Sequence, residues 1–352
     1  MNSLGIPIFF YIHPFFKPKG EIPSSADTDW SGFSLGIYTW TIQTFLRLKE
    51  AGVQCELTYE LPDEGIVFAH RKCLSSVDNL YKEKIKPSRS RFIVDITADF
   101  NMYSHANMHI IQNKKQALAS PYYEFITHWT QPNIKVRDKK RGSLIKNVAY
   151  YGNIRNIPKE LKNPQWSIEL DRLDCHWISK YQEFKWENIQ TYQMDTGWSS
   201  YTDVDLIVAI RSFSKRTCQF DNKPATKLYN GWLAGVPCIL GKESSLIFER
   251  KSKLDYIEVT NYHETLSAVK LLKKNPNLYS DMVANGLERS KEISPEATTK
   301  NWCLLIENVI IPSYQKWLNS SEIEKTTSIA IQKLFNFNYH VNHRIMHSIL
   351  RK

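Results

Sequence analysis

Two lysines and a threonine mark the start of a predicted helix in the second half of the chain. The stretch KPATKLYNGWLAGVP (Lys223–Pro237) opens with a proline suited to a first helical turn and ends near Gly235, which allows the left-handed stop of a helix. Lys223, Thr226 and Lys227 therefore stand at the helix N-terminus, where free N–H groups, a hydroxyl and two cations favour an anion, above all phosphate. The alternative is an ordinary crossover helix with solvated lysines.

A carboxylate and two histidines follow a predicted strand in the first half of the chain. Asp99 closes the sequence VDITAD at the end of an apolar run, where a carboxylate could act as general base on a substrate hydroxyl. Its alternative role is to cap a turn or a helix. His105 and His109 follow and could hydrogen-bond a substrate, although single histidines are more often structural.

The sequence GFSLG (Gly32–Gly36) matches the G-x-S-x-G pattern of serine hydrolases. That pattern needs a strand leading directly into the serine, whereas a polar loop precedes Ser34. A loop that turns tightly into the following helix is therefore the better interpretation, and a hydrolase using Ser34 is the minor alternative. No phosphate loop, G-x-G-x-x-G or H-E-x-x-H motif is present in the sequence.

Strand and helix patterns alternate along both halves of the chain. The first half contains these strand candidates: Ile6–Ile12, Cys55–Tyr59, Gly65–Ala69, Phe92–Thr97, His109–Gln112 and Tyr123–His128. The second half contains these: Val148–Tyr151, Ile189–Tyr192, Asp205–Ile210, Pro237–Leu240 and Tyr256–Val259. Helical patterns lie between the strands, which is typical of parallel sheets with helices on both faces.

We therefore expect an α/β fold with two Rossmann-like doubly wound domains that face each other across a cleft. The expected boundaries are 1–140 for the first domain, 141–318 for the second and 319–352 for a C-terminal helical tail. In such sheets ligands bind beyond the carboxyl ends of the strands, so the cleft between the domains is the expected site. The tail has apolar residues spaced among Lys, His and Arg, and it either packs on the body or lies on a membrane surface.

Composition and charge narrow the classes of partner. The 352 residues carry a formal charge of +10, which fits nucleic acid, an anionic membrane or a phosphorylated substrate. The lysines are scattered without interleaved aromatics, so nucleic acid is not expected. The six cysteines form no C-x-x-C pair, which argues against disulfides and structural zinc. With no secretory leader and no membrane span, we expect a cytoplasmic protein, with peripheral contact to an anionic membrane as a further expectation.

The stretch Lys223–Gly241 resembles the second domain of nucleotide-sugar glycosyltransferases of the GT-B architecture, in the broad group that includes the family 4 enzymes. The matching positions of that group's K-P-x-x-K-L and G-x-P segments are Lys223, Pro224, Lys227, Leu228, Gly235 and Pro237. The likeness extends upstream to VDLIVAIR (Val204–Arg211) and to the strand and turn at Asn147–Asn153, and is thinner in the first half.

This resemblance implies a metal-independent glycosyltransferase that needs no cofactor and moves a sugar from a nucleoside-diphosphate sugar to a hydroxyl acceptor. The implied donor-diphosphate ligands are Lys223, Thr226, Lys227 and Arg211, and the implied ribose or sugar ligands are Asn230, Glu243 and Ser244. On the acceptor side it implies a site with Gly32, His105 and His109, and with Asp99 and Asp29 as catalytic carboxylates. The acceptor would be a glycan, a lipid-linked saccharide or a small molecule.

One departure from the family pattern concerns its two glutamates. Asn222 and Asn230 stand at those positions. An asparagine side chain accepts a hydrogen bond from a ribose hydroxyl but carries no charge. A non-catalytic sugar-nucleotide-binding protein of the same fold is therefore the alternative function.

Overall fold

The computed structural model describes residues 5–76, 79–182, 197–213 and 220–349. Its first sheet is six-stranded, wholly parallel and ordered β2-β1-β3-β4-β5-β6. The strands are β1 (Ile8–Tyr11), β2 (Glu56–Thr58), β3 (Gly65–His70), β4 (Arg91–Ile96), β5 (Met108–Ile111) and β6 (Tyr123–Phe125). These confirm the six strands expected from the first half of the sequence.

Short helices connect these strands. They are η1 (Pro14–Phe16), η2 (Ser31–Ser34), α1 (Gly36–Tyr38), η3 (Thr39–Gln43), α2 (Thr44–Glu50), α3 (Arg71–Leu74) and α4 (Lys114–Ala117). The elements α1, η3 and α2 follow one another without a break and form the helix expected after the loop Gly32–Gly36. Their apolar side chains, Trp40 and Leu48 among them, are buried against the sheet.

The second sheet is five-stranded, parallel and ordered β11-β10-β9-β7-β8. Its strands are β7 (Asn147–Asn153), β8 (His176–Gln182), β9 (Leu206–Ala209), β10 (Cys238–Gly241) and β11 (Ile257–Val259). Strand β8 was not predicted from the sequence, and the predicted strand Ile189–Tyr192 lies outside the described residues. Two doubly wound parallel sheets confirm the expected fold class.

Helices cover both faces of the second sheet. They are η4 (Lys139–Arg141), η5 (Ile154–Asn156), α5 (Lys159–Lys162), α6 (Pro164–Asp171), α7 (Thr226–Ala234), α8 (Ser244–Glu249), α9 (Tyr262–Lys274) and α10 (Pro276–Ser290). Helix α7 ends at Gly235, whose φ of 67° is the left-handed stop expected from the sequence.

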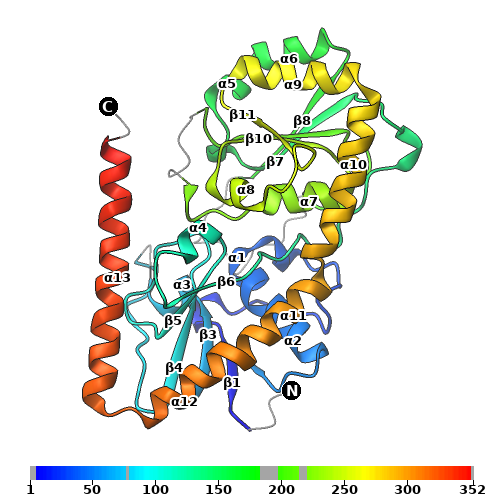
Figure 1. Cartoon of the computed structure of the whole chain (residues 1–352). Helices are drawn as coiled ribbons and strands as arrows, with labels where there is room; N and C mark the ends of the chain where they lie inside the picture. Colours follow the sequence, from blue (N-terminus) through cyan, green and yellow to red (C-terminus); the bar gives the residue numbers. More distant parts are fainter. Residues whose placement is uncertain (1–4, 77–78, 183–196, 214–219, 350–352) are drawn as a thin grey trace.

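The chain then returns to the first domain through η8 (Lys291–Ile293), α11 (Pro295–Leu305), η9 (Ile306–Ile310) and α12 (Ile311–Asn319), as Figure 1 shows. Trp302 and Tyr314 are buried in the core of the first sheet, and the Tyr314 hydroxyl donates to the carbonyl of Ser90 at 3.1 Å. The sequence interpretation had grouped this segment with the second domain. Its apolar face instead covers the first sheet.

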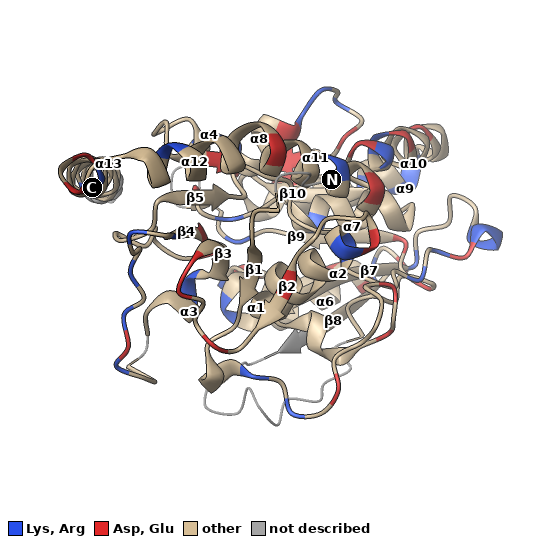
Figure 2. Cartoon of the chain, turned by 90° about the horizontal axis from the view of Figure 1, so that it is seen from below, with Lys and Arg blue, Asp and Glu red and all other residues tan. Residues whose placement is uncertain are grey.

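The last helix, α13 (Glu322–Ile349), runs along the outer edge of the first domain. Figure 2 shows it end-on at that edge and shows Lys and Arg spread over many elements of the molecule. Within the described ranges, no helix combines the length and the apolar character needed to cross a bilayer.

The carboxyl ends of the two sheets face each other (Figure 1). Asn113, which follows β5, donates from Nδ2 to the carbonyl of Lys223 at 3.1 Å and to Ser244 Oγ at 3.0 Å. Lys115 pairs with Asp221 across the same boundary at 2.8 Å. Side chains that follow strands of both domains are therefore brought together at one interface.

Candidate functional site

Lys227 lies at the point where the order of the second sheet reverses. Strand β8 is on one side of β7, and β9, β10 and β11 are on the other, so the switch point falls between β7 and β9. Lys227 Nζ donates to the carbonyl of Tyr151 in β7 at 2.6 Å. A Cβ atom on Gly152 would lie 2.7 Å from this Nζ, so a larger residue there would displace the ammonium group from its present position.

Arg211 and Glu243 complete the cluster at the switch point. Arg211 follows β9, Glu243 follows β10, and the two side chains form a buried ion pair. Burial, and then the Arg211 guanidinium, lower the pKa of Lys227 to about 7, while Glu243 and Asp99 act in the opposite direction. Lys227 therefore loses its proton readily. A bound anion would raise the pKa of Lys227 and restore its positive charge.

Three polar groups around this cluster are buried without a hydrogen-bond partner among the described residues. They are Thr226 Oγ1, at the first residue of α7, Arg211 Nε and Ser245 Oγ. Buried polar groups in folded proteins nearly always have a partner, so a ligand or an ordered water that reached these three would satisfy them. All three are donors, which suits a phosphate oxygen.

Asp99 and Lys223 meet across the domain boundary. The Asp99 carboxylate accepts from Lys223 Nζ at 2.8 Å and from Gln112 Nε2 at 3.0 Å. Desolvation opposes ionisation of Asp99, but the charges of Lys223 and Arg211 outweigh it and hold the pKa of this carboxyl below its usual range. The predicted base and one predicted phosphate ligand are thus brought together, each engaged with the other.

The two asparagines in the glutamate positions make contacts between segments. Asn230 Oδ1 accepts from the backbone N–H of Gln131 at 3.1 Å, and Asn222 Nδ2 donates to the carbonyl of Asp99 at 2.6 Å. Ser244 is buried at the start of α8 and accepts from Asn113 Nδ2. Their roles toward a donor sugar stay predictions.

The predicted acceptor loop precedes α1. Asp29 is exposed in this loop, and no interaction joins it to Asp99 in the described structure. Gly32 is buried in η2, where a Cβ atom would come within 2.4 Å of the Trp30 ring. Ser34 ends η2 and donates to the carbonyl of Ser31 at 2.8 Å. No strand leads into Ser34, so the nucleophile elbow of a hydrolase is not formed.

The two predicted acceptor histidines lie elsewhere. His109 is fully buried in β5, with Nδ1 2.8 Å from Asp95 Oδ2 and Nε2 3.3 Å from Asn336 Nδ2. His105 lies in the connection between β4 and β5 and lines a cavity beside α13. Neither histidine contacts Asp99 or Lys223 in the part of the chain that the structure describes.

His70 was not singled out from the sequence, although it stands at the switch point of the first sheet. It is the last residue of β3, next to β1, where the strand order reverses. Its Nδ1 accepts from the backbone N–H of Lys72 at 3.2 Å, and burial lowers the pKa of His70 to about 3, so the ring is neutral. The terminal histidine of the run GIVFAH was the signal that could have indicated it.

Among the described residues, no three His, Cys, Asp or Glu side chains come together in a way that could hold a metal ion.

Comparisons with known proteins return matches only among solved structures. No family model and no curated protein matches the sequence. Anabaena HepE, solved with UDP and glucose, aligns with a TM-score of 0.49 and 10% identity over 86% of this chain and 100% of that chain. AviGT4, a glycosyltransferase involved in avilamycin A biosynthesis, aligns with a TM-score of 0.48 and 10% identity over 90% of this chain and 99% of that chain.

A third match is Staphylococcus aureus TarM, with a TM-score of 0.46 and 11% identity over 79% of this chain. The alignment spans 58% of the TarM chain. A match to the GtfA/B complex spans 60% of the matched chain in that complex. These identities and TM-scores leave the assignment of function to the geometry of the site.

Proposed function

We propose that this protein is a glycosyltransferase that binds a nucleoside-diphosphate sugar on its second domain and transfers the sugar to a hydroxyl acceptor on its first domain. The observation that carries the proposal is the position of Lys227 and Arg211 at the switch point, beside the N-terminus of α7. Departure of a nucleoside diphosphate leaves negative charge on its phosphates, and fixed cations and helix N–H groups stabilise that charge.

The ion pair between Asp99 and Lys223 suggests how the acceptor would be activated. A diphosphate bound at the N-terminus of α7 competes for Lys223, because it carries more charge than one carboxylate. Once Lys223 turns to the phosphate, Asp99 loses its nearest cation and its pKa rises toward the usual range. Asp99 then accepts the proton of the acceptor hydroxyl more readily. We propose that Lys223, Lys227 and Arg211 supply the charge without a metal ion.

A ligand screen by thermal shift tests the donor site. UDP, GDP, ADP, CMP and their sugars are compared, and one nucleotide is expected to raise the melting temperature by several degrees at saturating concentration. Lys227→Met should abolish that shift, whereas Lys270→Met, which removes an exposed lysine on α9, should leave it intact. Absence of a shift with every nucleotide would contradict the donor site.

The second candidate function is binding of a nucleotide sugar without transfer. It is favoured by Asn222 and Asn230, which already make contacts between segments and carry no charge. Mass spectrometry of acceptor mixtures with the stabilising donor separates the two functions. Formation of a glycosylated product supports the transferase, whereas a nucleotide that binds and stays intact with every acceptor class supports the binding protein.

A further inference from the structure

Helix α13 buries polar side chains against the first domain and exposes large apolar side chains on its opposite face. The most buried side chains on the face packed against the first domain are polar: Lys325, Gln332 and Asn336 are 4%, 1% and 3% exposed. Gln332 Nε2 donates to the carbonyl of Asn107 at 2.7 Å, and Asn336 Oδ1 accepts from the Tyr123 hydroxyl at 2.6 Å. The helix is held to the body by these hydrogen bonds and by the partly buried Ile329 and Tyr339, which pack on the first domain.

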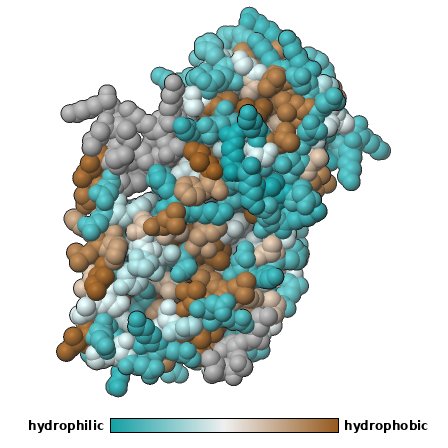
Figure 3. Space-filling view, viewed as in Figure 1, coloured by the Kyte–Doolittle hydropathy of each residue, from teal (hydrophilic) through white to brown (hydrophobic). Residues whose placement is uncertain are grey.

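The opposite face of α13 exposes large apolar side chains. Ile323, Leu334, Phe337 and Ile345 are 80%, 60%, 63% and 47% exposed and recur at helical spacing. Figure 3 shows apolar side chains along the edge of the molecule that α13 forms. A helix face of this kind is typical of a surface that is covered in the working state.

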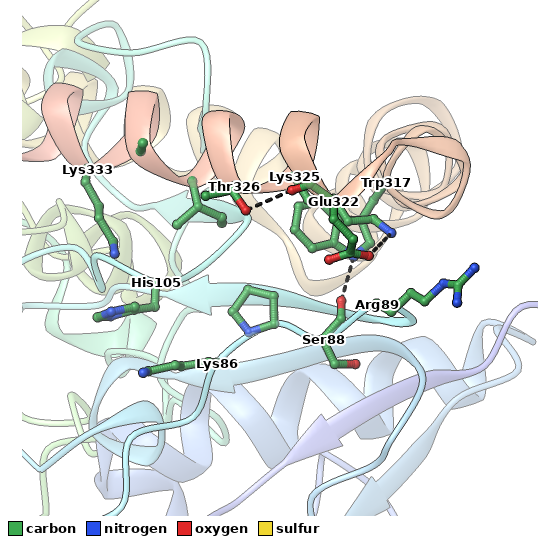
Figure 4. Close-up of a pocket in the computed structure, with 12 residues that line it drawn as sticks. Lys86, Ser88, Arg89, His105, Trp317, Glu322, Lys325, Thr326 and Lys333 are labelled. Atoms are coloured by element: carbon green, nitrogen blue, oxygen red, sulfur yellow. Dashed lines mark hydrogen bonds and ion pairs between the residues drawn. The ribbon is translucent and has the colours of Figure 1, made fainter.

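Two cavities adjoin each other beside this face, and they differ in character. One has a volume of about 360 Å³ and is lined by Lys86, Arg89, His105, Lys325 and Lys333. Figure 4 shows Lys86, His105 and Lys333, from three different segments, toward the same end of it. The other cavity, of about 610 Å³, shares Lys333 with the first and is lined mainly by apolar groups.

The first cavity carries an excess of positive charge. Within the described residues, no carboxylate lies at ion-pair distance from Lys86 or Lys333, and Glu322 pairs only with Lys325, at 3.5 Å. Burial, and then the charges of Lys333, Lys86 and Lys84, lower the pKa of His105. Cations beside an apolar groove match a ligand that has a phosphate at one end and hydrocarbon at the other.

We propose that α13 and the two cavities beside it dock the protein on a bilayer of anionic phospholipid. The phosphates would lie at Lys86 and Lys333, and Leu334 and Phe337 would enter the boundary of the hydrocarbon. This proposal goes beyond the proposed function, because it concerns the exposed face of α13 along the outer edge of the first domain and not the cluster around Lys227.

The charge of the helix favours a membrane over a second copy of the chain. From Thr326 to Lys352 the sequence holds Lys333, Arg344, Arg351 and Lys352 and no Asp or Glu. Two copies paired in parallel along this helix would bring like cations together, which is destabilising, because its acidic residues Glu322 and Glu324 lie only in the first turn. An anionic bilayer instead attracts each lysine and arginine near its surface.

Vesicle flotation tests the proposal with the full-length protein. Vesicles of phosphatidylcholine alone are compared with vesicles of equal parts phosphatidylcholine and phosphatidylglycerol, at low and high salt. The protein should float with the anionic vesicles, and binding should fall with salt. The double variant Leu334→Ser, Phe337→Ser should bind at least about tenfold more weakly. The control Leu271→Ser, which changes an exposed leucine on α9, should bind as the wild type does.

A second variant isolates the charge. Lys86→Gln with Lys333→Gln should weaken binding to anionic vesicles by about fivefold for each lysine and leave nucleotide thermal shifts unchanged. Failure of the wild type to float with anionic vesicles would overturn the proposal, as would wild-type flotation by both double variants. A dimer in analytical ultracentrifugation that Leu334→Ser, Phe337→Ser dissociates would assign the face to a second copy instead.

Discussion

Lys227 is placed where its charge depends on pH within the physiological range. Its pKa of about 7 in the folded protein lies well below the ordinary 10.5, so the ammonium loses its proton above pH 7 in the free protein. The unfolded chain keeps its proton up to the ordinary pKa. This residue therefore contributes more to the free energy of unfolding as the pH rises from about 7 to 10.5, since the unfolded state binds more protons there.

The affinity for the donor should decrease as the pH rises. In the proposed site a diphosphate would bind the protonated Lys227, so affinity should fall by up to about tenfold for each pH unit above 7. Titration calorimetry with the intact nucleotide sugar, in buffers of different ionisation enthalpy, should show proton uptake above this pH. Lys227→Met should bind weakly and without the pH dependence, and a steep dependence in that variant would place the titrating group elsewhere.

Asp99 can be tested separately from donor binding. Asp99→Asn removes the proposed base and also frees Lys223 from its ion pair. Turnover should fall by at least about a hundredfold, while affinity for the nucleotide sugar stays the same or increases. Steady-state kinetics together with binding measurements check both parts. Unchanged turnover would remove Asp99 from the base role.

At the scale of elements, the close packing of α7 on β10 fixes the N-terminus of α7 at the site. Gly231 lies on the buried side of this helix, and a Cβ atom there would lie 2.2 Å from Cys238 Sγ and 3.1 Å from the carbonyl oxygen of Val236. Glycine at this position thus allows the helix to approach the strand.

Gly231→Ala should destabilise the protein, because the added methyl group forces α7 away from β10. We expect a loss of about 1–3 kcal/mol in the free energy of unfolding, measured by urea denaturation. The matched control is Gly36→Ala, where the nearest atom to a new Cβ is His70 Nε2 at 4.0 Å. Equal effects of both substitutions would contradict this account of the contact.

Most elements could be predicted because buried parallel strands are short apolar runs bounded by polar residues. Strand β8 escaped this rule because polar residues interrupt its sequence, and its Trp177 and Ile178 are only partly buried. The packing of α11 and α12 on the first domain could not be predicted from the sequence either. An amphipathic pattern shows which face of a helix is buried, but not which sheet it packs against.

The candidate site also combines features that local sequence patterns predict with features that depend on the tertiary structure. The sequence KPATK predicted a helix start, and α7 begins at Thr226, so Thr226 and Lys227 lie in its first turn whereas Lys223 and Pro224 precede the helix. His109 could not be assigned in this way. Whether its side chain faces a ligand or the interior depends on the register of β5 against β4, and that register pairs it with Asp95.

At the scale of the whole molecule, ion pairs join the two domains. Lys114 pairs with Glu249 and Lys115 with Asp221, both at 2.8 Å. The two carboxylates are 8% and 7% exposed, so loss of a lysine would leave a nearly buried charge unpaired.

The variant Lys114→Gln, Lys115→Gln should therefore sample arrangements in which the domains are further apart. Small-angle X-ray scattering should show a larger radius of gyration than for the wild type. The charge-matched control Lys270→Gln, Lys274→Gln, on α9, should scatter as the wild type does. Identical radii in both variants would show that these pairs do not hold the domains together.

The return of the chain through α11 means that the polypeptide passes between the domains twice, once between β6 and β7 and once near η8. Two domains joined by two chain segments move most freely by rotation about the line through the two connections. Gln131, in the first passage, is hydrogen-bonded to Asn230 on α7. Because this hydrogen bond links the connection to the helix that begins with Thr226, we expect binding at the proposed phosphate site to change the angle between the domains.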